Sequence, residues 1–388
     1  MKTKMKISIL FTCLFLMATM SITPILADIQ KTFSGVGTTS VQLINTLPNL
    51  FVIIFTLVAG FLASRFSKKS LVITGLCFVI LAGIGGFFFN SSLTMLYVWS
   101  ICLGIGMGLF SPVIALIIND EYEGKERGDM LGFQTTFNNL GAIILSTLSG
   151  FLAVAGWKFG YLSYLLAIPV LLVVIFFMKG DKSAVAEGGK PKSLKVNSTV
   201  LYYTAMVVIF IMTYNVYATN VAMFTIQEKL GDASTAGLAN SVSLVGGLVG
   251  GFIFGKISNK IDNLMLPLGY VLIAIGFLLT YSATSLVMAC VGAFIAGVSI
   301  SFFMPQAIFA TTRELSPEYI TMGLSIVSTF GSLGAFISPL VYTTSATAVM
   351  GNDSAKSRFL FVGIIALVLA VIVAVVVTAR KKKLAASN

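Results

Sequence analysis

The residues of this chain that could bind a ligand are aromatic rings, methionines and amides that interrupt long apolar runs. The seventh run carries Phe210, Tyr214 and Asn215 close together at helical spacing. The other candidates fall in the first, second, fifth and tenth runs: Met17, Met20, Gln42, Asn45, Thr46, Gln134, Asn138, Asn139, Ser299, Phe302 and Gln306. Such side chains offer apolar contact and uncharged hydrogen bonds, which suit noncovalent binding of a small molecule.

Each kind of candidate also has a purely structural interpretation. Aromatic residues gather where a helix meets the lipid headgroups, and methionine fills irregular gaps in any core. An amide such as Asn138 or Asn139 would be costly against lipid, so it must face either a cavity or a neighbouring helix that it hydrogen-bonds. The sequence leaves both alternatives open for these amides and for Tyr214.

Groups for acid–base, metal or nucleophilic chemistry are missing from the apolar runs. The chain has no His, which removes the commonest metal ligand and general base. The four cysteines lie singly in apolar runs, so we interpret them as small hydrophobic residues. No Asp, Glu, Lys or Arg lies well inside a run. We therefore expect no enzyme activity, no cofactor and no metal, and we disfavour compact, highly charged substrates.

The elements that must position these residues are long apolar helices. Of the 388 residues, 57% are hydrophobic and 10% are charged, and the mean hydropathy is +0.98. About 20 apolar residues of helix cross a bilayer, and the chain has twelve such runs, which lack the alternation of membrane strands. The runs are 7–27, 41–64, 70–90, 94–118, 130–153, 159–178, 199–224, 236–255, 264–282, 286–310, 321–342 and 359–379. We predict an all-α polytopic membrane protein with twelve transmembrane helices.

The first run has a second interpretation as a signal peptide, because MKTKMK precedes it. Its 21 apolar residues exceed the usual length of a signal-peptide core, and keeping it gives an even number of spans. We therefore favour a first membrane span.

Positive charge is unevenly distributed between the two ends of the spans. With the N-terminus in the cytoplasm, 20 of the 25 Lys and Arg residues fall on the cytoplasmic side. The five on the other side are Lys31, Lys158, Lys229, Lys356 and Arg358. Because cytoplasmic loops are enriched in Lys and Arg, we predict that both termini are cytoplasmic. The net charge of +11 then reflects topology and contact with the lipid bilayer, and we expect no nucleic-acid partner.

The two halves of the chain repeat each other. GFLASRFSKK at 60–69 returns as GFIFGKISNK at 251–260, GIGMGLFSP at 104–112 as GVSISFFMP at 297–305, and TFNNLGA at 136–142 as TFGSLGA at 329–335. Three matches in one order, at offsets of 191 and 193 residues, indicate two six-span bundles with the same orientation. The bundles are 1–178 and 199–388, joined by a Lys-, Gly- and Ser-rich cytoplasmic linker at 179–198.

Twelve spans in two pseudo-symmetric bundles, with a basic turn after the second span, resemble the major facilitator superfamily over nearly the whole chain. The family's signature in that turn is Gly, three residues, Asp, Arg or Lys, one residue, Gly, and two basic residues. Residues 60–69 match it except at Ser64 and Ser67, and residues 251–260 match it less completely. The resemblance implies the fold of this family, alternating access, a bacterial cytoplasmic membrane and a central cavity lined by the first, fourth, seventh and tenth spans. We expect a monomer.

The same resemblance implies a conformational role for the basic turns. In the first half, Arg65 and Lys69 could pair with Asp120 and Glu121 at the end of the fourth span. In the second half, Lys256 and Lys260 could pair with Glu314. The two turns begin at Gly60 and Gly251, which complete the set of expected gating residues. The alternative is that these cations only set the topology.

The predicted function is a secondary active or facilitative transporter of a small neutral or amphiphilic organic molecule, with export favoured over uptake. The alternatives are an uptake permease for a small organic anion that uses charges at the ends of spans and, remotely, a non-transporting receptor. A coupling proton or ion is left open, since acids such as Asp120, Asp129 and Glu228 lie only at the ends of runs.

Overall fold

The computed structural model describes residues 2–63, 65–179, 198–315 and 320–387. By its internal contacts the chain divides into two compact units, which are described separately below. The first unit comprises residues 1–195 with 236–238, and the second comprises 196–235 with 239–388. Ser64 and nearly all of the expected linker at 179–198 lie outside the described residues.

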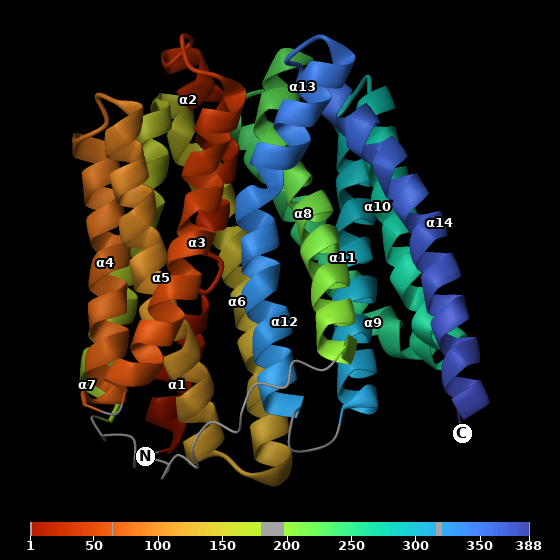
Figure 1. The fold of residues 1–388 in the computed structure, drawn as a ribbon. Coiled ribbons are helices and arrows are strands. Elements are labelled where there is room, and N and C mark those ends of the chain that lie inside the picture. Colours follow the sequence, from red (N-terminus) through yellow and green to blue (C-terminus); the bar gives the residue numbers. More distant parts are fainter. Residues whose placement is uncertain (1, 64, 180–197, 316–319, 388) are drawn as a thin grey trace. The chain divides into compact units, whose positions relative to one another are not determined.

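The first unit contains the first six spans, whose ribbons run from red to yellow-green in Figure 1. Its elements are α1 (Lys2–Cys13), the 3-10 turns η1 (Ala18–Ser21) and η2 (Thr23–Ile25), α2 (Leu26–Thr32), α3 (Thr38–Leu62), α4 (Lys68–Phe88), α5 (Leu93–Glu121), α6 (Gly124–Leu152), η3 (Ala153–Ala155), η4 (Trp157–Leu166) and α7 (Ala167–Phe177). Helix α5 packs along both α3 and α4.

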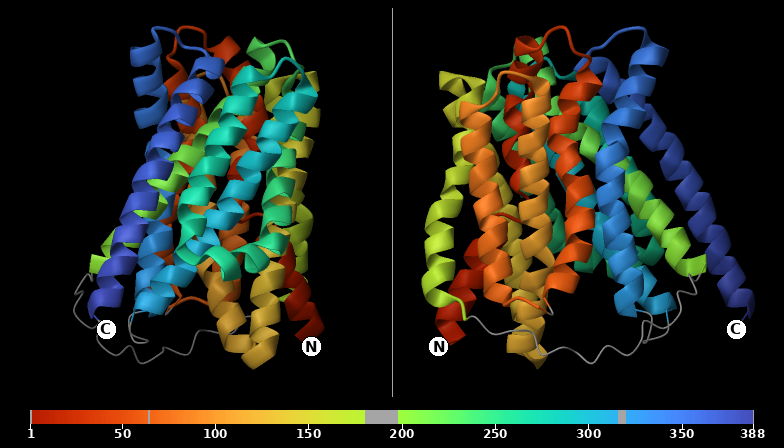
Figure 2. Two further views of the ribbon diagram at one scale, coloured as in Figure 1. Left: turned by 90° about the vertical axis from the view of Figure 1, so that its right-hand side faces the viewer. Right: turned by 60° about the vertical axis from the view of Figure 1, so that its left-hand side comes forward.

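The second unit contains the other six spans. Its elements are α8 (Ser198–Gln227), α9 (Ala233–Ile261), η5 (Asp262–Leu264), α10 (Met265–Ser282), α11 (Leu286–Glu314), α12 (Ile320–Ser338), the π-helical turn η7 (Pro339–Thr343), α13 (Thr344–Met350) and α14 (Ala355–Ser387). Helix α10 packs along α11 and α14, and α12 packs along α8. The two views of Figure 2 show the long helices of each unit running in roughly one direction.

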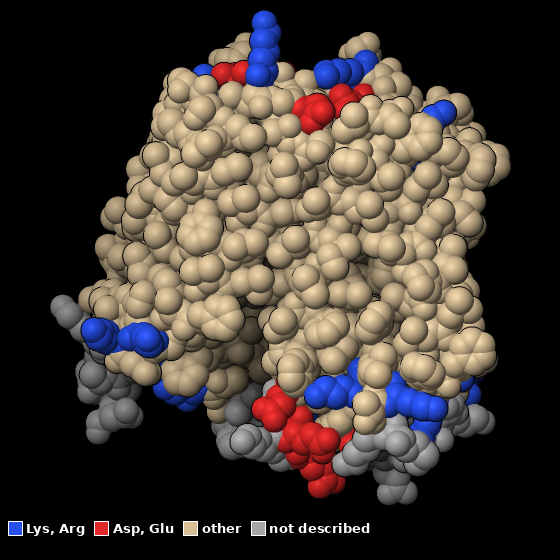
Figure 3. All heavy atoms as spheres, turned by 180° about the vertical axis from the view of Figure 1, so that it is seen from behind, with Lys and Arg blue, Asp and Glu red and all other residues tan. Residues whose placement is uncertain are grey.

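The helices fit the twelve predicted spans by length and composition. Eleven helices in the described part of the chain are long and apolar enough to cross a membrane, and the bent pair formed by residues 3–13 and 18–32 makes a twelfth. On the face drawn in Figure 3, Lys, Arg, Asp and Glu lie near the two ends of the spans, and the band between them is uncharged. This distribution is the one that a bilayer requires.

Several predicted spans were too short. Helix α9 continues to Ile261, so residues 251–260 form its last turns and are not the turn that we predicted. Helix α11 likewise continues to Glu314. Lys and Arg side chains extend from a helix end toward water, so a helix need not stop where the apolar run stops.

The internal repeat corresponds to equivalent helix contacts in the two units. A Cβ at Gly104 would lie 2.5 Å from the Pro48 carbonyl oxygen, and one at Gly297 would overlap the Ser243 carbonyl oxygen. Glycine is therefore needed where α5 crosses α3 and where α11 crosses α9. The repeated glycine marks the same close helix crossing in each unit.

Polar caps define the starts of the long helices. The Oγ atoms of Ser92 and Ser285 accept the backbone N–H three residues later at the starts of α5 and α11. At the start of α9, Asp232 and Thr235 form a capping box. The Thr235 backbone N–H holds the pKa of Asp232 below its ordinary value, because the hydrogen bond stabilises the charged carboxylate.

Candidate functional site

The first span is broken near its middle, at the position of two predicted binding residues. Regular helix ends at Cys13, and the segments 3–13 and 18–32 meet at 48°. Met17 lies in the break and Met20 lies in η1, and both side chains are half-buried. The Tyr164 hydroxyl of η4 donates to the Ala18 carbonyl oxygen over 3.0 Å, which ties the irregular segment to the sixth span. Broken spans of this kind form binding sites in many transporters.

The structure brings this break against the fifth span, one turn from the predicted residue Asn138. A Cβ at Gly141 of α6 would overlap the Leu14 carbonyl oxygen, so the backbone of α6 touches the broken segment. Asn138 lies three residues before Gly141, and its half-buried side chain has an Oδ1 atom that accepts no hydrogen bond from the described residues. Because a buried carbonyl without a donor is costly, Asn138 is the strongest candidate for a polar contact with a ligand in this unit. Gln134 and Asn139 are also half-buried on α6.

Helix α3 adds buried polar groups to the same unit. Gln42, Asn45 and Thr46 are all buried, and α3 packs against η1. Asn45 Oδ1 and Thr46 Oγ1 have no hydrogen-bond partner in the described part of the chain. These two atoms could accept hydrogen bonds from a ligand or from water.

In the second unit, Phe210 packs against aromatic neighbours rather than lining an open site. Its ring stacks on Phe303 of α11, with centroids 3.9 Å apart and an interplanar angle of 1°. Tyr270 of α10 meets Phe210 edge-on at 5.2 Å. Phe210 thus joins three helices, a role that differs from the ligand contact that we predicted. Helical spacing alone cannot tell the packed face of α8 from an open one.

Asn215 also has a structural role, because it satisfies a carbonyl group that a proline leaves unpaired. Pro339 has no N–H, so the Ala335 carbonyl one turn earlier lacks its usual helical donor. Asn215 Nδ2 donates to that oxygen over 3.1 Å. Ser338 Oγ donates to the Met212 carbonyl oxygen over 2.7 Å, and the Thr213 and Tyr342 hydroxyls lie 3.0 Å apart. Asn215 is therefore one contact of a polar seam between α8 and the distorted eleventh span.

The other predicted residues of this unit divide into buried and half-buried groups. Ser299 is buried and donates to the Ala296 carbonyl oxygen within α11, and Phe302 is buried. Gln306 is buried near the end of α11, where its Oε1 accepts from Ser258 Oγ over 2.8 Å. Tyr214 is half-buried on α8. Of this set, Tyr214 has the side chain with the most exposed surface for a ligand.

The basic turn of the first unit pairs differently from our expectation. Lys68, which is 9% exposed, forms an ion pair with Asp120. Lys69 Nζ donates to the Ile175 carbonyl oxygen over 2.6 Å and so caps the end of α7. Arg65 is exposed, with its guanidinium 4.5 Å from the centre of the Phe61 ring. Ser67 caps α4 and starts the helix at Lys68, which places Lys68 rather than Arg65 opposite Asp120.

Two further expected gating residues of this unit can be placed. Glu121 is half-buried at the end of α5. Burial, together with the carboxylates of Glu126 and Glu121, raises the pKa of the neighbouring Tyr122 hydroxyl. A methyl group at Gly60 would meet nothing within 4 Å, so no described contact requires glycine there.

In the second unit, Glu314 pairs with Arg380 of α14 rather than with the expected Lys256 or Lys260. Arg380 Nη2 lies 2.5 Å from Glu314 Oε2, and the Tyr203 hydroxyl donates to Glu314 Oε1 over 2.7 Å. Lys256 and Lys260 are exposed on the last turns of α9. We predicted a turn at residues 251–260, but Lys256 and Lys260 lie in helix α9. Their side chains therefore do not project from a turn toward Glu314 as we expected.

The last expected gating residue of the second unit is Gly251, and Arg313 is the neighbour of Glu314. A methyl group at Gly251 would meet no described atom within 4 Å, so this glycine makes no close helix contact. Arg313, next to Glu314, forms an ion pair with Asp262 at the end of α9.

The sequence analysis missed a buried cation. Arg358, in the first turn of α14, is 1% exposed, although the sequence placed it at the end of a run. Its guanidinium forms an ion pair with Asp353 and donates to Asn220 Oδ1 of α8 over 2.9 Å. The buried charge is therefore compensated within the second unit. An Asp five residues before an Arg at the start of a span is a weak signal that could have suggested it.

Comparison with known proteins decides the family. The family model described as "Major Facilitator Superfamily" matches residues 8–204 and again 204–388, which is one match for each half. The chain belongs to the Major Facilitator Superfamily. It is a membrane transporter of this superfamily and not an enzyme.

Individual relatives are more distant. The chain is 24% identical over 292 residues to a protein of Staphylococcus epidermidis described as "Probable nitrate transporter NarT", with 71% of each chain covered. Among solved structures, it is similar to a bacterial homolog of the human lysosomal transporter Spinster (TM-score 0.75, 15% identity, 97% and 96% of the two chains). It is also similar to the peptide transporter POT in complex with sulfate (TM-score 0.77, 14% identity, 97% and 94%). At these identities the solved structures support the fold.

Proposed function

We propose that this member of the Major Facilitator Superfamily transports a small neutral or amphiphilic organic molecule by alternating access. The substrate binds through apolar contacts and a few uncharged hydrogen bonds. In the first unit, the residues proposed to contact a ligand are Met17, Met20, Gln134, Asn138 and Asn139. In the second unit, taken by itself, the proposed contact is Tyr214.

The observation that carries this proposal is that the broken first span packs against α6 at Gly141, one turn from Asn138. Breaks in membrane helices are tolerated where the backbone lines a cavity or is buried in protein. Here the break coincides with a half-buried amide whose Oδ1 has no hydrogen-bond donor among the described residues. A neutral ligand with a hydroxyl, amine or amide N–H would supply that donor.

The absence of charge from these contact residues favours a neutral substrate. None of the six side chains is ionisable at neutral pH, and the buried Arg358 is already paired with Asp353. A compact anion would lose its hydration without gaining a counter-charge from these residues. We favour export over uptake because the candidate contacts are uncharged and rich in Met and aromatic residues. The distribution of Lys and Arg supports cytoplasmic termini, and the resemblance to the family supports a bacterial cytoplasmic membrane.

A second candidate function is uptake of a small anion. Its support is the similarity to the probable nitrate transporter of S. epidermidis. In this chain an anion would have to use cations near the ends of spans, such as Arg313, which is 45% exposed.

The test is a thermal-shift screen of the full-length protein purified in an uncharged detergent. The compounds are neutral aromatic and amphiphilic molecules, amino acids, sugars, carboxylates and nitrate. A ligand that binds the native state raises its apparent stability. We expect stabilisation by neutral aromatic compounds that Asn138→Leu removes and that Thr135→Val, a change at an exposed α6 hydroxyl, leaves intact. Stabilisation by nitrate or a small carboxylate alone would overturn the neutral-substrate proposal in favour of the second candidate.

A further inference from the structure

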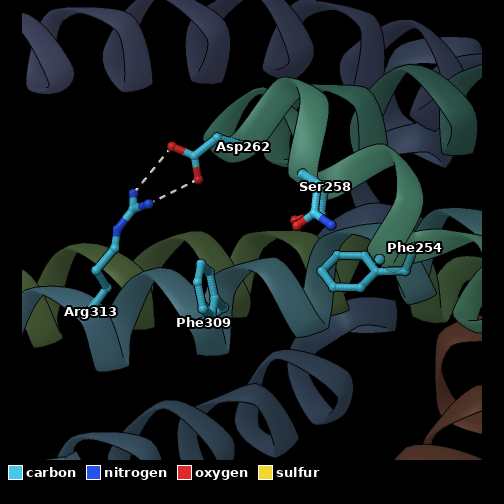
Figure 4. Close-up of a pocket in the computed structure, with 7 residues that line it drawn as sticks. Phe254, Ser258, Asp262, Phe309 and Arg313 are labelled. Carbon is cyan, nitrogen blue, oxygen red and sulfur yellow. Dashed lines mark hydrogen bonds and ion pairs between the residues drawn. The ribbon is translucent and has the colours of Figure 1, made fainter.

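A pocket of about 370 Å³ opens at the end of α9, apart from the residues proposed above to contact substrate. Its lining combines two aromatic rings, Phe254 and Phe309, with polar groups from α9 and α11. Figure 4 shows Arg313 reaching from α11 to Asp262 at one end of the pocket, while the rings of Phe309 and Phe254 lie along its length. An apolar wall with a few convergent polar groups is the usual composition of a small-molecule site.

The charged pair of this pocket is accessible to a ligand. Arg313 donates to both carboxylate oxygens of Asp262, over 3.1 and 3.3 Å. The two side chains are 45% and 36% exposed, so both remain in contact with the pocket. A guanidinium has five N–H donors, of which these bonds use two. Arg313 can therefore bind an incoming anion while keeping or exchanging its bond to Asp262.

The backbone at Asp262 is strained, which marks the position as more than an ordinary helix end. Asp262 has φ +47° and ψ −126°, a conformation that favours glycine. Such strain costs about 1–3 kcal/mol and clusters at functional sites. The buried Gln306 fixes the arrangement, because it accepts from Ser258 over 2.8 Å and donates to Asp262 Oδ1 over 3.4 Å.

The charge around the pocket favours an anion. The pocket lining holds one cation, Arg313, and one carboxylate, Asp262. Lys256 and Lys260 are exposed on the same last turns of α9, outside the lining, and add positive charge within a few residues of Asp262. The excess of positive charge attracts anions. The Phe254 and Phe309 rings favour an apolar body attached to the anionic group.

We propose that the pocket between the ends of α9 and α11 binds an anion that carries an apolar body. Arg313 holds the anionic group, the Phe254 and Phe309 rings hold the apolar part, and Asp262 competes with the ligand for Arg313. An arylcarboxylate in solution and an anionic lipid headgroup share this chemistry. The site lies within the second unit and is distinct from the proposed contacts around Asn138.

The experiment is a ¹⁹F NMR titration of 4-fluorobenzoate into the full-length protein in an uncharged detergent, with neutral 4-fluorobenzamide as the matched ligand. We expect Arg313→Gln to weaken binding of 4-fluorobenzoate about tenfold, because one charge-assisted contact is lost. Asp262→Asn should tighten binding several-fold, because it removes the competing carboxylate. Arg65→Gln is the control, since Arg65 is an exposed arginine beside a Phe ring but outside the pocket.

Two outcomes would overturn the proposal. One is an unchanged dissociation constant in Arg313→Gln, and the other is weaker binding in Asp262→Asn, which would mean that the carboxylate holds a cation. Phe309→Leu keeps every charge and should weaken binding about threefold, so the pocket can still be tested if Arg313→Gln does not fold.

A second arm distinguishes the two sources of the anion. Titrations in nanodiscs of phosphatidylcholine, with and without phosphatidylglycerol, compare an uncharged bilayer with an anionic one. Competition by phosphatidylglycerol that Arg313→Gln abolishes supports a lipid headgroup in the pocket, and binding that is equal in both supports a soluble anion. Because these are binding measurements at Arg313, they stand or fall separately from transport of a neutral substrate.

Discussion

The Asn215–Ala335 hydrogen bond should stabilise the second unit because it replaces a bond that Pro339 cannot make. Pro339 begins the π-helical turn and offers no N–H to the Ala335 carbonyl. Asn215 Nδ2, from α8, donates to that oxygen over 3.1 Å, and the side chain is 8% exposed. Asn215→Leu keeps the approximate size of the side chain and removes the donor.

The magnitude follows from the cost of an unpaired buried carbonyl. That cost is about 1–3 kcal/mol, whereas hydrogen bonds between membrane helices average about 0.6 kcal/mol and reach about 1.7 kcal/mol. Because the usual helical donor is missing here, the bond should lie near the upper end of the membrane values. We expect Asn215→Leu to lower the free energy of unfolding by about 1.5 kcal/mol.

The assay is unfolding of the purified protein by titration with sodium dodecyl sulfate in mixed micelles. Thr225→Val is the matched control on α8, since the Thr225 hydroxyl bonds only to the Val221 carbonyl of its own helix in the described structure. It should cost less than about 0.5 kcal/mol.

A double-mutant cycle with Pro339→Ala tests the cause. The alanine restores an N–H one turn after Ala335, so Asn215→Leu should cost about 1 kcal/mol less in that background. An equal cost of Asn215→Leu in the presence and absence of Pro339 would refute the reasoning, because the bond would then not depend on the proline.

Three further outcomes are expected. Asp120→Asn leaves the nearly buried Lys68 without a counter-charge and should lower the free energy of unfolding by about 1 kcal/mol. The loss is no larger because Asp120 is 41% exposed, so water screens the pair. In the same titration, Arg65→Gln should cost less than about 0.5 kcal/mol. Asp232→Ala removes the cap of α9 and should cost about 1 kcal/mol at neutral pH. The Thr235 N–H lowers the pKa of Asp232, so the Asp232 carboxylate stabilises the folded protein fully above the ordinary carboxyl pKa of 3.8. This stabilisation is lost as the pH falls through the lowered pKa. Thermal unfolding measured against pH should show the loss in the native protein but not in Asp232→Ala.

The number and order of the spans could be predicted because lipid imposes a simple length rule. Apolar runs of about 20 residues are stable as helices that span the bilayer. The repeated Gly104 and Gly297 also correspond to equivalent helix crossings in the two units. The ends of α9 and α11 could not be predicted, because a helix continues through the charged residues that follow its apolar part. The break after Cys13 had no signal of its own, since Pro24 lies well beyond it in η2.

The partners of individual side chains were the least predictable feature. Lys68 rather than Arg65 meets Asp120 because the Ser67 cap sets the start of α4, a detail of one residue. Phe210 and Tyr214 belong to one helical stripe, yet only Tyr214 is half-buried, and this depends on which neighbouring helix each one faces. Such information lies in the packing of distant segments and not in the local sequence.

The central claim is that a neutral ligand is carried through contacts that include Asn138. The most direct measurement is release of a radiolabelled neutral compound, chosen by thermal shift, from proteoliposomes that contain the native protein, Asn138→Leu or Thr135→Val. The account predicts release by the native protein and Thr135→Val at similar rates, and release at least about tenfold slower by Asn138→Leu. Equal release by all three proteins, or release of nitrate in place of the neutral compound, would contradict it.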